Sequence, residues 1–177
     1  MKPPETIVLV CTGNTCRSVM AEAMLRQAFD EALGDFAKDV NVISAGVSAC
    51  PGDPASRHAE TAMEELGLDV SHHQASPVSG KTLSDADLVL TMTIAQKDKL
   101  LKDYALIEGK IMTLIEFADL AEELGEDIED PFGGSLETYR GSAHQISRAV
   151  KVITRKIKDL FESSRLRTDS HEDLHEN

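Results

Sequence analysis

The sequence predicts a three-layer α/β/α fold, in which helices cover both faces of a parallel sheet. Short, continuous apolar runs alternate with longer amphipathic segments, as in chains where strands and helices follow one another. The 177 residues suit a single domain with one sizeable core. Only 4% of them are aromatic, so aliphatic side chains must fill that core.

Four strands are predicted from the apolar runs. In chain order they are Ile7–Val10, Val40–Ser44, Asp87–Thr91 and Lys110–Thr113. The first is apolar at every position, which is typical of a strand buried on both faces of a sheet. Helix-length segments separate the strands, and this favours parallel pairing.

Amphipathic helices are predicted between and after these strands. In chain order they span Val19–Leu33, Pro54–Leu66, Thr93–Lys102, Ile115–Leu124 and Glu137–Phe161. Gly34 and Gly67 mark the ends of the first two helices. From Ser163 to Asn177 the chain is polar and lacks an apolar face. We therefore expect a folded domain of residues 1–162 and a disordered tail of residues 163–177.

The charge balance excludes several classes of partner. Lys and Arg total 18 against 31 Asp and Glu, which gives a net charge of -13. Such a surface repels nucleic-acid phosphates and anionic membranes. No run approaches the ~18 apolar residues of a membrane span. Three cysteines, an odd number, do not make a secreted disulfide framework. We expect a cytoplasmic protein; its oligomeric state stays open, with a monomer as the working expectation.

The residues directly after the first strand carry the chemistry, and they read Cys11-Thr12-Gly13-Asn14-Thr15-Cys16-Arg17-Ser18. Gly13 and Asn14 tolerate positive φ, so the loop can curl with its N–H groups inward. Such a ring of N–H groups, closed by a helix N-terminus, binds anions. Arg17 offers a planar fork to two phosphoryl oxygens, and a thiolate at Cys11 is placed to attack phosphorus. A buried core cysteine at a strand end is the structural alternative.

With this loop in view, the sequence resembles the low-molecular-weight protein tyrosine phosphatase family, whose Cys-x5-Arg-Ser motif lies next to the N-terminus. The similarity covers about residues 5–160 and includes, in the family's order, Ser44-Ala45-Gly46, Ser71-His72, Thr91-Met92-Thr93 and Asp130-Pro131. The resemblance implies a four-stranded parallel sheet, phosphorylated protein substrates, and hydrolysis through a phosphocysteine intermediate without a cofactor. No Cys or His pair has a partner pair at zinc-binding spacing, so no metal is expected.

The resemblance also assigns the general acid, which is an Asp before Pro in a late loop and therefore Asp130. From the residues alone, Asp130 is equally well one more surface acid, because the stretch Asp119–Asp130 holds seven acids and no bases. Asn14, Ser18, Ser44 and His72 resemble the polar set that shapes the loop and supports the thiolate.

Cys16 has two interpretations. It is either a small hydrophobe or a partner that forms a reversible disulfide with Cys11 and shields the thiolate from further oxidation.

Two positions bear on the substrate. Thr15 adds a hydroxyl where tyrosine-directed members tend to carry an aliphatic residue, and Phe132 is the one aromatic residue after Asp130-Pro131. Both features are similar to the protein-arginine phosphatase branch. A phosphotyrosine phosphatase is the alternative within the family. An arsenate reductase would need cysteines after Cys50, which the chain lacks, and a silent phosphate-binding module would not need Cys11, Arg17 and Asp130 together.

Overall fold

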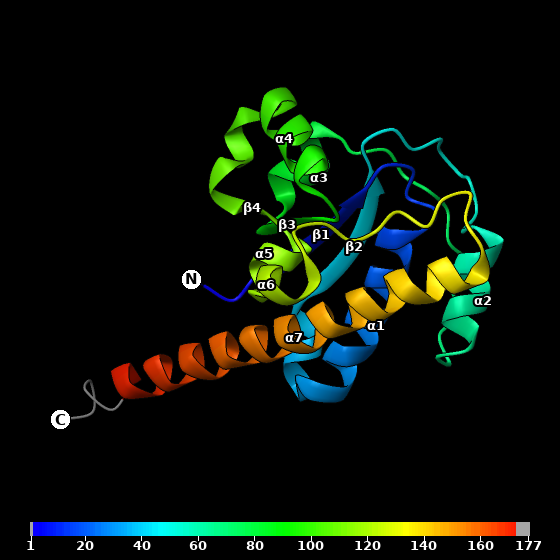
Figure 1. Cartoon of the computed structure of the whole chain (residues 1–177). Coiled ribbons are helices and arrows are strands. Elements are labelled where there is room, and N and C mark those ends of the chain that lie inside the picture. Colours follow the sequence, from blue (N-terminus) through cyan, green and yellow to red (C-terminus); the bar gives the residue numbers. More distant parts are fainter. Residues whose placement is uncertain (1, 173–177) are drawn as a thin grey trace.

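The computed structural model describes residues 2–172 and contains the predicted four-stranded parallel sheet (Figure 1). The strands are β1 (Thr6–Cys11), β2 (Asn41–Gly46), β3 (Leu88–Thr91) and β4 (Ile111–Thr113). Their order is β2-β1-β3-β4, with every neighbouring pair parallel. The predicted fold class is confirmed.

The strand order decides where a ligand can bind. From β1 the chain crosses to β2 on one side and then to β3 on the other, so the connections diverge at β1. In open parallel sheets the crevice beyond the carboxyl ends of the strands, at such a point, is the usual ligand site. Cys11 ends β1 opposite Gly46 of β2, and Val10 pairs with Thr91 of β3. The predicted nucleophile therefore stands at this crevice.

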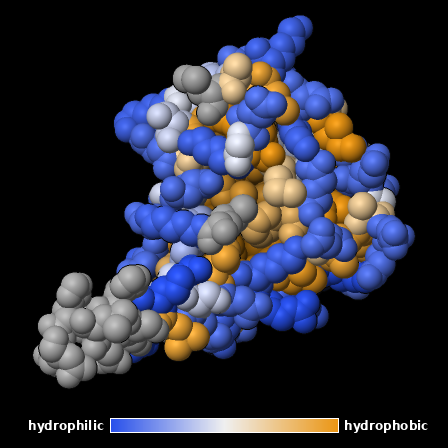
Figure 2. Space-filling view, turned by 90° about the vertical axis from the view of Figure 1, so that its left-hand side faces the viewer, coloured by the Kyte–Doolittle hydropathy of each residue, from blue (hydrophilic) through white to orange (hydrophobic). Residues whose placement is uncertain are grey.

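Alternating side chains of β1 divide the core into two layers. Ile7 and Leu9 face the larger layer, beneath α1 (Arg17–Ala32) and α7 (Leu136–Glu172). The same side holds α2 (Arg57–Glu64), α5 (Leu114–Ala118) and α6 (Ala121–Leu124). Val8 and Val10 face the smaller layer, beneath α3 (Gly80–Asp85) and α4 (Ile94–Asp103). On the face in Figure 2 most of the outer surface is hydrophilic, and apolar residues show mainly in a furrow between hydrophilic ridges.

Three details differ from the sequence prediction. Helix α3, which was not predicted, is short and mostly polar, and it begins where Ser79 accepts a hydrogen bond from the Thr82 N–H. The single helix expected over Ile115–Leu124 is divided, because Asp119 adopts a left-handed backbone (φ 55°) and ends α5. The chain also forms 3₁₀ turns at Gly34–Asp39 and Ala105–Lys110.

The expected disordered tail is wrong for residues 163–172, because α7 continues to Glu172 and its last turns extend beyond the body of the molecule (Figure 1). Once a helix is formed, each further residue adds a hydrogen bond without a new nucleation cost. The polar composition of this segment therefore did not prevent a helix. Residues 173–177 lie outside the described residues. No helix within residues 2–172 is long and apolar enough to cross a membrane.

Candidate active site

The loop after β1 wraps around the sulfur of Cys11. Cys11 is 3% exposed, and its Sγ accepts a hydrogen bond from the Asn14 N–H at 3.3 Å. The hydroxyl of Ser18, in the first turn of α1, lies 3.0 Å from the same Sγ. Two polar groups therefore contact the sulfur, and both are able to donate to a thiolate. This arrangement suits a nucleophile better than a packed core cysteine.

Asn14 holds the loop in its curled form. Of the two residues predicted to take positive φ, only Asn14 does so, at 55°. Its Nδ2 donates to Ser18 Oγ and to Ser44 Oγ, both at 2.9 Å, and its Oδ1 accepts from the Ser76 N–H at 2.8 Å. The side chain is fully buried. A non-glycine residue in this conformation needs such compensation, and the amide supplies both donors and acceptors.

The histidine that supports the loop is His73, and the prediction of His72 is wrong. The ring Nε2 of His73 donates to the carbonyl oxygen of Asn14 at 2.7 Å, whereas His72 is exposed. Adjacent histidines are equivalent in a sequence pattern. The turn closed by the His73 N–H and the Val70 carbonyl decides which ring faces the loop.

Gly46 lets the end of β2 approach the loop. A Cβ atom at this position would lie 2.6 Å from the carbonyl oxygen of Thr12 and 2.9 Å from the backbone nitrogen of Asn14. Both are backbone atoms and cannot rotate aside. The glycine is therefore a geometric requirement of the loop, a role that its place in the Ser44-Ala45-Gly46 match did not reveal.

Arg17 is buried, and two of its three side-chain nitrogen atoms bind other residues of the protein. Its Nη1 donates to the Ile128 carbonyl at 3.2 Å, and its Nη2 pairs with Asp130 Oδ2 at 2.6 Å. Its Nε is buried and has no hydrogen-bond partner in the described part of the chain. Buried donors are nearly always satisfied, so an unpaired one beside an anion loop indicates a missing acceptor. The Nε and Nη2 edge is the fork that a phosphoryl group takes in bidentate fashion.

The two residues Asp127 and Ile128, which precede Asp130 in the chain, are fixed to the end of β3 and the start of α4. The Asp127 carboxylate accepts from the Ile94 N–H at 2.7 Å, and the Ile128 N–H donates to the Met92 carbonyl at 2.9 Å. The Asp130 side chain is 51% exposed. It is thus held beside Arg17 and open to a substrate, whereas Asp127 anchors the segment.

A small pocket of about 190 Å³ forms above the loop. Its lining residues are Cys11, Thr12, Gly13, Thr15, Cys16, Arg17, Asp130 and Phe132. Phe132 stands at the rim and is 78% exposed. Eight of the predicted residues therefore line the pocket, and Asn14 supports its base. Ser18 and Ser44 join Asn14 in that support.

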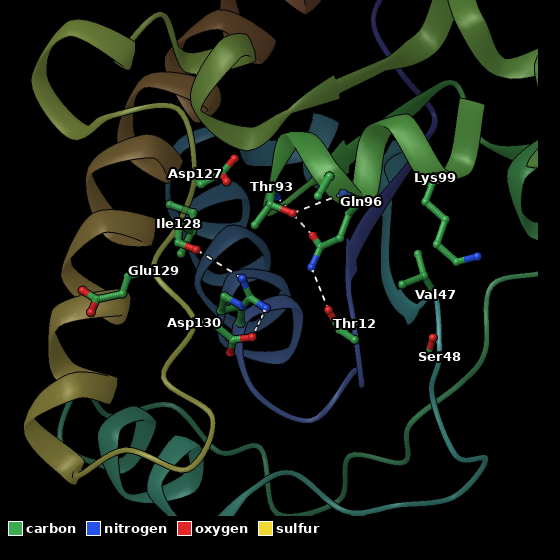
Figure 3. A pocket seen from close by; sticks show the side chains of 12 residues that line it. Thr12, Val47, Ser48, Thr93, Gln96, Lys99, Asp127, Ile128, Glu129 and Asp130 are labelled. Carbon is green, nitrogen blue, oxygen red and sulfur yellow. Dashed lines mark hydrogen bonds and ion pairs between the residues drawn. The ribbon is translucent and has the colours of Figure 1, made fainter. Parts of the chain in front are cut away.

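A larger cleft of about 550 Å³ adjoins the pocket and shares Thr12, Arg17 and Asp130 with it (Figure 3). Gln96 of α4 is one of the residues that line this cleft. Gln96 Nε2 donates to Thr12 Oγ1 at 3.1 Å, and its Oε1 accepts from the N–H groups of Met92 and Thr93. Sequence analysis missed this residue, although Thr93-Ile94-Ala95-Gln96 has the spacing of a helix capping box.

The sequence matches a known protein family over most of its length. The family model described as low molecular weight phosphotyrosine protein phosphatase matches residues 6–163. The chain belongs to this family. It is therefore a phosphatase, and Cys11, Arg17 and Asp130 occupy the positions that the family resemblance assigned to nucleophile, phosphoryl-binding arginine and general acid.

The similar proteins include both arginine phosphatases and tyrosine phosphatases. The chain is 35% identical to a protein-arginine-phosphatase of Bacillus subtilis over 153 residues, which are 86% of this chain and 96% of that protein. It is also 35% identical to the probable low molecular weight protein-tyrosine-phosphatase EpsP of Ralstonia nicotianae, over 88% of this chain and 98% of that protein.

The solved structure of the YwlE arginine phosphatase, a cysteine-to-serine mutant with a phosphorylated active site serine, superposes with a TM-score of 0.79. It is 34% identical, and the match covers 86% of this chain and 95% of that one. In that protein the residue replacing the cysteine carries the phosphoryl group, which fits a cysteine nucleophile in this phosphatase.

We predict that Gly46→Ala lowers both stability and activity, because the new methyl group must displace the phosphate loop. Overpacking of this kind costs roughly 1–3 kcal/mol, measurable by urea unfolding, and kcat/KM for p-nitrophenyl phosphate should fall. Gly109→Ala is the control, since its Cβ would meet nothing within 4 Å. If both variants had the same stability and the same kcat/KM, the close approach at Gly46 would not be a constraint on the loop.

We predict that Arg17→Lys does not retain activity, although it keeps the positive charge. Lysine cannot present the Nε and Nη2 edge and also reach the Ile128 carbonyl. Loss of one donor to a developing oxyanion typically costs ~10²–10³ in kcat. Steady-state kinetics with p-nitrophenyl phosphate measure the effect. A lysine variant within a few-fold of the parent would refute bidentate binding.

Proposed function

We propose that this phosphatase hydrolyses phosphoarginine residues in proteins. The observation that carries the proposal is that Thr15, a residue with a hydroxyl group, lines the 190 Å³ pocket. A guanidinium group consists only of N–H donors and needs acceptors around it. The similarity to a protein-arginine-phosphatase supports this substrate. The chain is equally similar to a probable tyrosine phosphatase, so sequence identity alone does not decide between phosphoarginine and phosphotyrosine.

In the first chemical step, the Cys11 thiolate attacks phosphorus in line with the bond to the guanidino nitrogen. The S–P bond forms as the N–P bond breaks, and the bond's electron pair goes to nitrogen. Asp130 donates a proton to that nitrogen, so arginine leaves as a neutralised leaving group and not as an anion. Arg17 and the loop N–H groups bind the phosphoryl oxygens as charge redistributes over them.

In the second step, water attacks the phosphocysteine. Asp130, now a carboxylate, takes a proton from the water, the S–P bond breaks, and inorganic phosphate forms. The electron pair returns to Cys11, where the Ser18 hydroxyl and the Asn14 N–H stabilise the departing thiolate. The Asp130 carboxylate pairs with Nη2 of Arg17. An arriving phosphoryl group competes for that donor and leaves the carboxyl group facing the scissile bond.

Phosphotyrosine is the second candidate substrate, and one observation favours it. Phe132 is largely exposed at the rim, where its ring could stack against a phenyl group. This is a single aromatic residue, however, and a hydroxyl beside it adds nothing to the binding of a phenyl ring. Arsenate reduction has less support, because the thiol outside the loop is the exposed Cys50 and no cysteine follows it.

We further propose that the enzyme works in the cytoplasm as a monomer. Its mechanism needs a reduced thiol at Cys11, and all three cysteines are free. Reducing compartments preserve such thiols. The surface charge of -13 disfavours nucleic acids and anionic membranes as partners. The protective role of Cys16 against oxidation stays a prediction.

We predict that Asp130→Asn slows hydrolysis in proportion to how poor the leaving group is. General acid catalysis is typically worth ~10²–10⁴-fold. A good leaving group such as p-nitrophenolate needs little protonation, so its turnover should fall least. The check is kcat for p-nitrophenyl phosphate and for a poorer leaving group, with Glu126→Gln as a matched control outside the pocket. Equal losses on both substrates would make Asp130 a structural residue.

We predict that the parent prefers phosphoarginine peptides and that Thr15→Ile shifts the preference toward phosphotyrosine. The substitution keeps the β-branch but removes the hydroxyl and widens the apolar wall. One such contact is worth roughly 10–200-fold in discrimination. Thr15→Val, nearly isosteric with threonine, separates the hydroxyl from the added volume. The measurement is kcat/KM for both peptides in all three proteins. A parent that prefers phosphotyrosine would overturn the arginine assignment.

A further inference from the structure

A closed group of three hydrogen-bonding side chains adjoins the pocket, and one of them, Cys16, also lines it. Cys16 ends the phosphate loop, Ser56 precedes α2, and Tyr139 belongs to the first turns of α7. Cys16 Sγ lies 3.3 Å from Ser56 Oγ and 3.3 Å from Tyr139 Oη, and the two hydroxyl oxygens are 3.2 Å apart. Cys16 and Tyr139 are both buried. Three elements distant in sequence are thus joined at one point.

This triad also holds Thr15 at both ends. The Ser56 N–H donates to the Thr15 carbonyl at 2.8 Å, and Thr15 Oγ1 lies 3.6 Å from Cys16 Sγ. The backbone of Thr15 is therefore tied to one member of the triad and its hydroxyl to another. Tyr139 contacts both of these members but not the pocket, because it is absent from the pocket lining.

The direction of the hydrogen bonds leaves Thr15 with free acceptor capacity. The Cys16 thiol donates to Ser56 Oγ, and the Ser56 hydroxyl donates to Tyr139 Oη. The Tyr139 hydroxyl can then donate to Cys16 Sγ and close the ring. Because the only thiol proton is used by Ser56, Cys16 does not donate to Thr15. The lone pairs of Thr15 Oγ1 remain available to the pocket.

The Tyr139 hydroxyl is suited to this role. Burial and its hydrogen bond with Cys16 raise the pKa of Tyr139 to about 12. The hydroxyl therefore keeps its proton at any pH where the enzyme would work, and it remains a donor to the sulfur. Its aromatic ring also lies 5.5 Å from that of His58, which adds a second fixed contact.

We propose that Tyr139 is a positioning residue for substrate selection, which acts through Cys16 and Ser56 to keep the Thr15 hydroxyl an acceptor for the guanidinium N–H groups. The inference rests on the proposed phosphoarginine activity. Without the Tyr139 hydroxyl, the Ser56 hydroxyl loses its acceptor and turns to Cys16 Sγ. The Cys16 thiol proton then turns to Thr15 Oγ1 and occupies a lone pair that the substrate needs. A phenolic substrate has no such N–H donor and is affected less.

The test uses Tyr139→Phe, which removes only the hydroxyl, with Tyr104→Phe as control at the one other tyrosine of the chain. We measure kcat/KM for phosphoarginine and phosphotyrosine peptides of the same sequence and compare their ratio. Tyr139→Phe should lower the phosphoarginine-to-phosphotyrosine ratio by roughly 3–10-fold, a partial loss of one hydrogen bond to a charged group. Tyr104→Phe should leave the ratio unchanged. If Tyr139 had a purely structural role, kcat/KM would fall by the same factor for both substrates. An unchanged ratio therefore overturns the proposal.

A double-mutant cycle tests the route through Thr15. In the Thr15→Val background the acceptor is already gone, so Tyr139→Phe should change the ratio no further. The same ratio change in both backgrounds would overturn the route. Ser56→Ala, which removes the acceptor of the Cys16 proton but keeps the backbone N–H, should lower the ratio in the same direction and replaces Tyr139→Phe if that variant does not fold. The parent's own preference tests the proposed function separately, because the ratio change is measurable whichever substrate the parent prefers.

Discussion

The left-handed backbone at Asn14 is the constraint on which the active site depends. It turns the chain shortly after β1, so that the Asn14 N–H points toward the sulfur of Cys11. A residue with a side chain adopts this conformation at a cost, and here the buried amide offsets it with bonds to Ser18, Ser44 and the Ser76 N–H. His73 binds the carbonyl of the same residue. Gly46 leaves the space into which the curled loop fits. Nucleophile, anion cradle and helix start are all placed by this one turn.

Much of this was predictable from the sequence, because the informative residues are close together. Strand β1 is buried at every position after Thr6 and therefore appears in the sequence as the continuous apolar run Ile7–Val10. The loop Cys11–Ser18 contains its own nucleophile, turn formers and arginine. Prediction failed where a local sequence pattern does not show which way a side chain points. It also failed where polar composition does not exclude a helix. His72 and His73 are indistinguishable without the turn, the left-handed Asp119 divides a helix without a glycine, and α7 continues through polar residues to Glu172.

The residues that the sequence concealed act across long separations. Tyr139 meets Cys16 over 123 positions, and Gln96 meets Thr12 over 84. Neither pairing follows from spacing, since only the packing of α7 and α4 against the sheet brings them together. Such residues matter for the substrate question. Relatives that act on arginine and on tyrosine are equally similar to this chain. In the proposed function, selectivity depends on a few atoms around Thr15 and on the side chains that orient them, because the phosphoryl chemistry at Cys11 and Arg17 is the same for both substrates.

We infer that Cys11 carries the phosphoryl group during turnover. Rapid acid quenching of the parent enzyme during hydrolysis of a phosphoarginine peptide, followed by mass spectrometry of its proteolytic fragments, tests this most directly. The account predicts one added phosphoryl group on the fragment that contains Cys11, assigned to that sulfur and absent when substrate is omitted. Turnover without any modified Cys11, or with the phosphoryl group on Cys16 or another side chain, would contradict it.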